Sequence, residues 1–153
     1  MVRVGLPRRW NFLSGADAPL SANSLRGVAE KARSNAYAPY SGFHVGAALR
    51  SAAGNVYGGA NVENASFGVG ICAERSALVA AVTAGDRNFD ELVLVSDATE
   101  PAAPCGACRQ ALSEFAPALR IVSHGLNGET AEWSLAELLP HQFKLDEQNR
   151  ITE

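Results

Sequence analysis

The spacing of apolar residues predicts three helices of ordinary length and one short helix. From residue 21, SANSLRGVAEKARSNAY offers a Ser or Asn cap and then places apolar residues at helical intervals. The alanine-rich stretch ICAERSALVAAVTAG keeps this spacing up to Gly85, so we expect a helix to begin close to Cys72. The third helix, CGACRQALSEFA, also opens on a cysteine, and LAELL predicts the short one.

Shorter apolar runs bounded by turn residues predict strands. HVGAALRS and NVYGGANVEN form a hairpin whose turn lies around residues 53–55. ELVLVSDA and LRIVSHG each predict a short apolar strand after a helix, and a further strand is expected around Trp133. The order helix, strand, strand, helix, strand, helix, strand favours an α/β layered domain whose later strands run parallel.

The chain has the length and composition of one compact domain. Its 153 residues are 47% hydrophobic, which is enough apolar surface to bury a sizeable core. Residues 1–20 follow no clear period and are expected to be an irregular N-terminal extension. The domain itself is expected over residues 21–145, followed by a polar tail at 146–153.

Charge and hydropathy exclude several classes of partner. The net charge of -3 and the pI of about 5.6 argue against binding to nucleic acid, which needs a concentrated surface of Lys and Arg. No apolar run is long enough for a membrane span, and the first residues lack the apolar stretch of a secretory signal. We therefore expect a cytoplasmic protein without a membrane partner, acting on a small uncharged or cationic molecule.

The three cysteines are the first candidates for chemistry. Cys72, Cys105 and Cys108 cannot all pair within one chain, and PCGACRQ alone is compatible with a redox disulfide, a structural metal or a catalytic metal. Both cysteine groups stand where a strand ends and a helix begins, and helix N-termini lower the pKa of thiols. Three thiolates can occupy three corners of a tetrahedron around zinc and leave the fourth corner for water.

Two charged residues follow Cys72 directly. Glu74 falls in the first turn of the predicted helix, close enough to a metal at Cys72 to shuttle protons for water. Arg75 could offset the negative charge that three thiolates give to a zinc site. In isolation, Glu74 would be an ordinary helix N-terminal acid and Arg75 an ordinary surface residue, so both assignments depend on the neighbouring cysteine.

Taken together, these motifs resemble the cytidine deaminase family in its small three-cysteine form. CAERSA and PCGACRQ carry the family's zinc-deaminase signature. The resemblance extends over roughly residues 21–145 through YAPYSGFHVGAAL, NVENAS and LLPHQF. It implies a three-layer α/β/α domain around a mixed central sheet of about five strands.

The resemblance also implies an activity and an assembly. Members of the family convert cytidine and deoxycytidine to uridine and deoxyuridine in pyrimidine salvage, releasing ammonia, and the small form works as a homotetramer. The cysteines that match Cys72, Cys105 and Cys108 bind one zinc ion per subunit. The glutamate that matches Glu74 takes a proton from water and delivers it to the pyrimidine.

Further contacts with a nucleoside are implied by the same resemblance. The family uses the pair that matches Asn61 and Glu63 to hold ribose hydroxyls, and alternation near a strand end puts both side chains on one face. A carboxylate there disfavours a phosphate by repulsion, which favours a free nucleoside over a nucleotide. The remaining expected contacts are stacking of Phe43 on the base, main-chain bonds beside Ala73 and Ala103, and Phe143 reaching a neighbouring subunit's site.

Alternative interpretations remain open on the sequence alone. PCGACRQ could serve as a thioredoxin-like redox pair, and His44, His124 or His141 could complete a closed structural zinc site in a non-catalytic module. A deaminase of a modified cytosine nucleoside, such as blasticidin S, would share the ligands and the glutamate. The chain departs from the family at His44, where proline is common, and at Phe67, where tyrosine is frequent, which leaves the substrate preference open.

Overall fold

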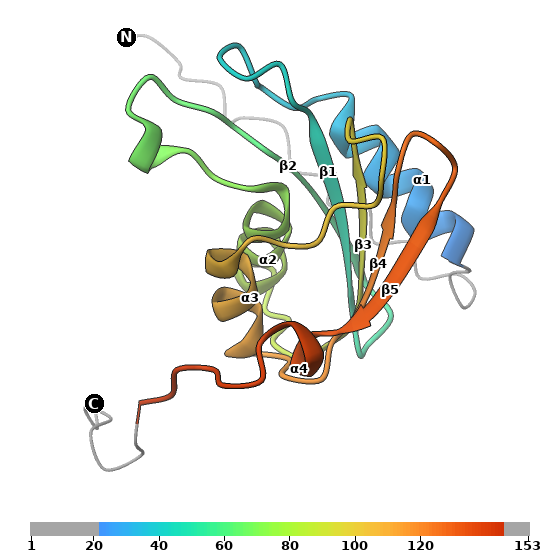
Figure 1. The fold of residues 1–153 in the computed structure, drawn as a ribbon. Coiled ribbons are helices and arrows are strands. Elements are labelled where there is room, and N and C mark those ends of the chain that lie inside the picture. Colours follow the sequence, from blue (N-terminus) through green and yellow to red (C-terminus); the bar gives the residue numbers. More distant parts are fainter. Residues whose placement is uncertain (1–21, 146–153) are drawn as a thin grey trace, which may run out of the picture.

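The chain folds around one five-stranded mixed sheet (Figure 1). The structure, a computed structural model, describes residues 22–145, so the extension expected at 1–20 and the tail at 146–153 lie outside the described residues. The strands lie in the order β2-β1-β3-β4-β5. Their bounds are β1 Val45–Ser51, β2 Val56–Ala60, β3 Phe89–Ser96, β4 Arg120–His124 and β5 Thr130–Ser134.

Strand directions follow the lengths of the connections. β1 and β2 form the predicted antiparallel hairpin, and β1 also pairs antiparallel with β3. β3 and β4 run parallel, as expected, because the connection between them includes a helix that can cross over the sheet. β5 follows β4 after a short turn and pairs with it in the antiparallel direction. The expectation of a mixed sheet of five strands is confirmed.

Helices cover both faces of the sheet (Figure 1). The helix α1, Ala22–Arg33, packs Leu25 and Ala29 against Val93 and its neighbours on one face. On the other face, α2, Ala73–Thr83, and α3, Gly106–Ser113, bury Ala77 and Leu112 against the alternate residues of the same strands. Because side chains of a strand alternate between faces, each strand supplies two cores, and the predicted three-layer architecture is confirmed.

Two helices begin at cysteines, as the sequence predicts. Cys72 is the N-cap of α2, and Cys105 is the N-cap of α3. α2 lies so close to β2 that a Cβ added at Gly59 would overlap the backbone of Ala73 and Ala77. The short elements η1, Phe67–Val69, and α4, Leu135–Leu138, complete the fold. Among residues 22–145, no helix is long and apolar enough to cross a membrane.

Candidate active site

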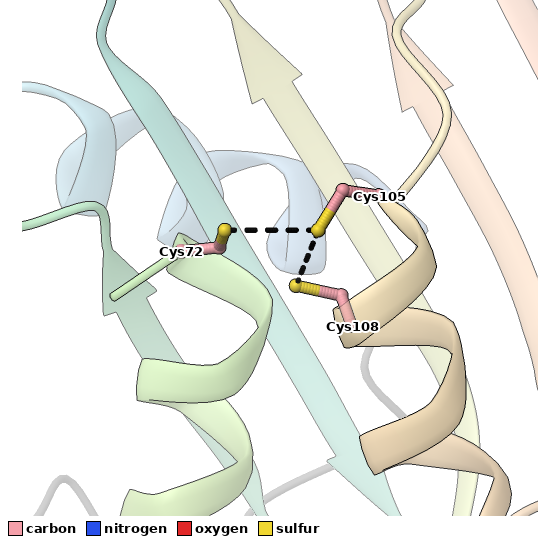
Figure 2. A group of neighbouring side chains, drawn as sticks. All are labelled: Cys72, Cys105 and Cys108. Atoms are coloured by element: carbon pink, nitrogen blue, oxygen red, sulfur yellow. Dashed lines mark hydrogen bonds between the residues drawn. The ribbon is translucent and has the colours of Figure 1, made fainter. Parts of the chain in front are cut away.

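The N-termini of α2 and α3 bring three cysteine sulfurs together (Figure 2). The Sγ atoms of Cys72 and Cys105 lie 3.9 Å apart, and those of Cys105 and Cys108 lie 3.5 Å apart. Ligands at the usual zinc–sulfur distance on a tetrahedron are separated by about 3.8 Å. The three sulfurs therefore fit one zinc ion. A cluster that includes Cys72 also favours a metal over a dithiol formed by Cys105 and Cys108 alone.

The pKa values of Cys72 and Cys108 are shifted in opposite directions. Hydrogen bonding from the Cys108 thiol, assisted by the Arg75 guanidinium and opposed by burial, lowers the pKa of Cys72 to about 5. The same contact with Cys72, together with burial, raises the pKa of Cys108. In this pair one sulfur is a thiolate and the other keeps a proton, and a metal cation that binds both would displace that proton. This donor chemistry suits a thiolate-binding metal.

Glu74 lies in the first turn of α2 with only 6% of its surface exposed. Burial raises the pKa of its carboxyl group, and the negative charge of Cys72 adds to this effect. The backbone at the helix start and the charge of Arg75 oppose the shift. A raised pKa makes a carboxyl group a better proton acceptor than an ordinary exposed glutamate.

Arg75 turns its guanidinium toward the loop before α2. Its Nη2 atom lies 3.4 Å from the carbonyl oxygen of Gly70 and 4.0 Å from Cys72 Sγ. Its Nε is buried and has no hydrogen-bond partner among the described residues. Interaction with the sulfurs raises the pKa of Arg75 further, so the cation expected beside the thiolates does lie beside them.

A cavity of about 460 Å³ opens in front of the sulfurs and Glu74. This volume is within the range of small-molecule sites. It brings together most of the residues that the sequence singled out, from four separate segments of the chain. Those residues are Phe43, Asn61, Glu63, Cys72, Ala73, Glu74, Arg75, Ala103 and Cys105.

Two expected residues do not line the cavity. Cys108 is fully buried in α3 behind the other two sulfurs. Phe143 is 70% exposed, and its backbone is held by Gln110, whose amide accepts from Phe143 N at 3.1 Å and donates to Phe143 O at 3.0 Å. Phe143 therefore does not line the cavity of its own chain.

Asn61 and Glu63 both brace the segment that precedes β1. Asn61 accepts a hydrogen bond from Val45 N and donates one to Phe43 O, each at 2.8 Å. Glu63 accepts from the backbone amides of Tyr40 and Ser41 at 3.0 and 3.2 Å, and from the Ser41 hydroxyl. The Ser41 hydroxyl is the main reason that the pKa of Glu63 is lowered.

The resemblance assigned this pair to a sugar, whereas an asparagine beside a turn often bonds to the backbone, as Asn61 does here. An amide and a carboxylate each offer more hydrogen-bonding positions than these contacts use, so both residues can also face a ligand. The cavity wall includes further residues that sequence reasoning missed, such as Val45, Leu94 and Ser96 at the ends of β1 and β3. Their only signal in the sequence is that each lies in or beside an apolar run.

A three-layer α/β domain with three cysteine sulfurs and a buried glutamate beside one cavity is typical of zinc-dependent deaminases. The chain belongs to the cytidine and deoxycytidylate deaminase family. The model of that family described as "Cytidine and deoxycytidylate deaminase zinc-binding region" matches residues 21–133. The resemblance noted in the sequence is thereby confirmed.

Curated relatives and solved structures agree with this membership. The chain is 45% identical over 120 residues to a cytidine deaminase from Halalkalibacterium halodurans, covering 78% of this chain and 91% of the relative. It is 39% identical over 135 residues to a cytidine deaminase from Sporosarcina psychrophila, covering 88% and 99%. A crystal structure of cytidine deaminase from Burkholderia pseudomallei superposes with a TM-score of 0.78 at 45% identity, covering 81% of this chain and all of that one.

A more distant relative has a different named substrate. A blasticidin-S deaminase from Bacillus cereus is 32% identical over 108 residues, which is 65% of this chain and 76% of the relative.

Proposed function

We propose that this protein deaminates cytidine and deoxycytidine to uridine and deoxyuridine and releases ammonia. The observation that carries the proposal is the buried carboxyl group of Glu74, which stands beside three cysteine sulfurs in a cavity large enough for a nucleoside. Relatives of the chain at 39% to 45% identity are cytidine deaminases, which supports the choice of substrate.

Cys72, Cys105 and Cys108 would hold one zinc ion per subunit, since their sulfurs match a tetrahedral ligand set. Zinc bound there would supply Lewis-acid chemistry that makes water a better nucleophile at neutral pH. Arg75 would offset the excess negative charge of the three thiolates, because its guanidinium lies 4.0 Å from Cys72 Sγ.

Glu74 would carry the protons of the reaction. When water replaces the amino group, the carbon–nitrogen bond breaks and both water protons end on nitrogen, one on the ring and one on the departing ammonia. A single carboxyl group can take each proton from oxygen and deliver it to nitrogen. The raised pKa of Glu74 favours its protonated form, which suits the step that delivers a proton.

The walls of the cavity would position the nucleoside. Phe43 would contact the base, and main-chain groups beside Ala73 and Ala103 would hold its polar edge. Asn61 and Glu63 would bind sugar hydroxyls with the hydrogen-bonding positions that remain beyond their contacts with the loop. The Glu63 carboxylate would repel a phosphate, so free nucleosides would be preferred over nucleotides and nucleic acid.

The working form would be a cytoplasmic homotetramer in which Phe143 reaches the site of a neighbouring subunit. Several large apolar side chains on η1, on α2 and beside α3 support self-association, because isolated subunits would expose them to water. They are Phe67 at 82% exposure, Phe143 at 70%, Val69 at 68% and Val79 at 58%.

A modified cytosine nucleoside is the second candidate substrate. A neighbouring cavity of about 360 Å³, lined by Tyr40, Asn64 and others, shares Glu63 and Phe67 with the main cavity. It gives room for a substituent larger than a ribose hydroxyl, and the relative from Bacillus cereus is named for such a substrate.

The test is the change in ultraviolet absorbance when the purified protein meets cytidine, deoxycytidine, free cytosine and blasticidin S separately, with zinc content measured on the same sample. Turnover of the two nucleosides but not of the free base would support the proposal and the sugar contacts. Turnover of blasticidin S alone would favour the second candidate. Stoichiometric zinc without turnover of any compound would favour a non-catalytic module.

A further inference from the structure

The segment from Tyr40 to His44 carries Phe43, which lines the wall of the cavity. It has no regular secondary structure, so its position depends on side chains from elsewhere. Asn61 and Glu63 hold it from the side of β2 through Phe43 O, Tyr40 N and Ser41 N. These contacts leave the other side of the segment, toward β3, to be fixed by something else.

Asp97 binds the side of this segment that faces β3. Its Oδ2 accepts from the backbone N–H of His44 at 2.9 Å and contacts the ring Nδ1 of His44 at 2.7 Å. Its own backbone N–H donates to His44 O at 3.0 Å. Residue 44 is thus bound through its amide, its carbonyl and its side chain by one residue that is 53 positions away in sequence.

The carboxylate of Asp97 is itself held in place. Arg33, at the end of α1, donates from Nη1 to Asp97 Oδ1 at 3.0 Å and lies 3.3 Å from Ser96 O. Burial raises the pKa of Asp97, but the His44 amide and ring and the charge of Arg33 outweigh it, so the pKa is lowered and Asp97 accepts hydrogen bonds as an anion. Arg33, Asp97 and His44 therefore form a continuous chain from α1 to the cavity wall.

We propose that Asp97 and His44 are positioning residues that hold Phe43 in the substrate-binding arrangement. This inference rests on the deaminase function proposed above. If the wall is free to leave its position, only a fraction of molecules can bind the nucleoside, and the apparent affinity falls by that fraction. The chemistry at Glu74 is unaffected once the nucleoside is bound. The signature is a raised KM with an unchanged kcat.

The first variant is Asp97→Ala, which removes both side-chain contacts with His44. We expect KM for cytidine to rise about tenfold, with kcat within about twofold and full zinc content, as the loss of charge-assisted hydrogen bonds would give. The matched control is Asp86→Ala. Asp86 is also a half-buried carboxylate that accepts from two side chains, Asn55 at 2.9 Å and Tyr57 at 2.7 Å, but it lies at the far end of β1.

A second pair of variants tests the ring contact without changing Asp97. His44→Ala removes the donor from a side chain that is 42% exposed, so the fold should tolerate it, and KM should rise about threefold. His44→Asn should restore the wild-type KM, because its amide nitrogen stands at the position of ring Nδ1. A KM that stays unchanged in both Asp97→Ala and His44→Ala would overturn the proposal. So would a KM that rises as much in Asp86→Ala as in Asp97→Ala.

Amide hydrogen exchange separates this inference from the proposed function. In Asp97→Ala, amides of residues 40–45 should exchange faster than in the wild type, while those near residues 51–57 should not; Asp86→Ala should show the reverse. This comparison needs no substrate. If the wild type does not turn over cytidine but the exchange pattern holds, Asp97 and His44 position this segment and the proposed function fails. Equal exchange in residues 40–45 of Asp97→Ala and wild type would contradict the positioning role, whatever the activity.

Discussion

At the scale of single residues, Glu74 combines two influences that pull its pKa in opposite directions. Burial and the neighbouring thiolate favour the protonated form, whereas the start of α2 and Arg75 favour the anion. The balance leaves the pKa raised, which suits a group that must both accept and release a proton. A glutamate at a helix N-terminus is common, but one that is 6% exposed beside three sulfurs is not explained by helix capping.

Glu74→Gln should keep the fold and the zinc but lose turnover by about 100-fold to 10,000-fold, the range typical of a general acid–base residue. Glutamine fills the same space and cannot exchange a proton at its amide. Steady-state rates with cytidine and zinc content measured on the same sample test this prediction. Glu114→Gln, at the exposed end of α3, is the control and should behave as wild type. Wild-type turnover by Glu74→Gln would remove this residue from the mechanism.

Asn61 and Glu63 illustrate how one side chain can serve both the fold and the site. Each side chain fixes backbone groups of the segment before β1 and also lines the cavity. A substitution at either position would therefore disturb the cavity wall as well as any contact with a sugar. Loss of binding in such a variant would not, by itself, prove a ribose contact.

At the scale of elements, the candidate metal site lies at the junction of α2 and α3. Cys72 is the N-cap of one helix, and Cys105 and Cys108 belong to the start of the other, so an ion bound there would join two segments that are 33 residues apart at their cysteines. Ions bound only by the folded state add their binding free energy to its stability.

Cys105→Ala should therefore lose zinc and unfold at a lower temperature, by at least about 5 °C. Zinc content and thermal unfolding with and without a chelator check this prediction. The chelator should lower the Tm of the wild type to near that of the variant and should leave the variant unchanged. Full zinc occupancy in Cys105→Ala would show that the ligand set is wrong.

A second junction ties the hairpin of β1 and β2 to the end of α2. Tyr57 donates to Asp86 at 2.7 Å, and burial together with this contact raises the pKa of Tyr57 to about 12. In the unfolded chain a tyrosine titrates near 10. Between these values the unfolded chain loses the proton while the folded protein keeps it, so stability falls as the pH rises from about 10 to about 12.

Tyr57→Phe removes this titration. Below pH 10 the wild type should be the more stable protein, by about 1.5 kcal/mol for one hydrogen bond to a charged carboxylate. The difference should shrink as the pH rises toward 12. Denaturant unfolding of both proteins at several alkaline pH values measures this difference in the free energy of unfolding. A difference that stays constant across this range would show that the pKa of Tyr57 is not raised in the folded state.

At the scale of the whole molecule, the sequence predicted what depends on local pattern. Helical spacing and alternation located the four α-helices and five strands of residues 22–145, but not the short helix η1. α1 ends at Arg33 and α3 at Ser113, a few residues before the predicted ends. The cysteine motifs predicted the cluster of three sulfurs. The bonds from Asp97 to His44 and from Asn61 and Glu63 to the loop were not predictable, because they join loops distant in sequence and leave no periodic signal.

The exposed ring of Phe143 is available to contact a neighbouring subunit. Gln110 fixes the backbone of Phe143 on the outside of α3, and the ring is 70% exposed rather than in the cavity of its own chain. If the ring completes a neighbouring site, Phe143→Ala should raise KM for cytidine several-fold while zinc content and the number of sites stay unchanged. Light scattering of the wild type should report a tetramer in the same experiment.

Mixed oligomers distinguish a contact between subunits from a contact within one. Phe143→Ala and Glu74→Gln chains, co-expressed in equal amounts, should produce sites that take Glu74 from one chain and Phe143 from the other. Random assembly makes about a quarter of all sites complete when each site combines two subunits of a symmetric oligomer. The mixture should then exceed the summed activity of the two variants at low cytidine concentration. If Phe143 acts within its own chain, every site lacks one of the two groups and mixing brings no gain.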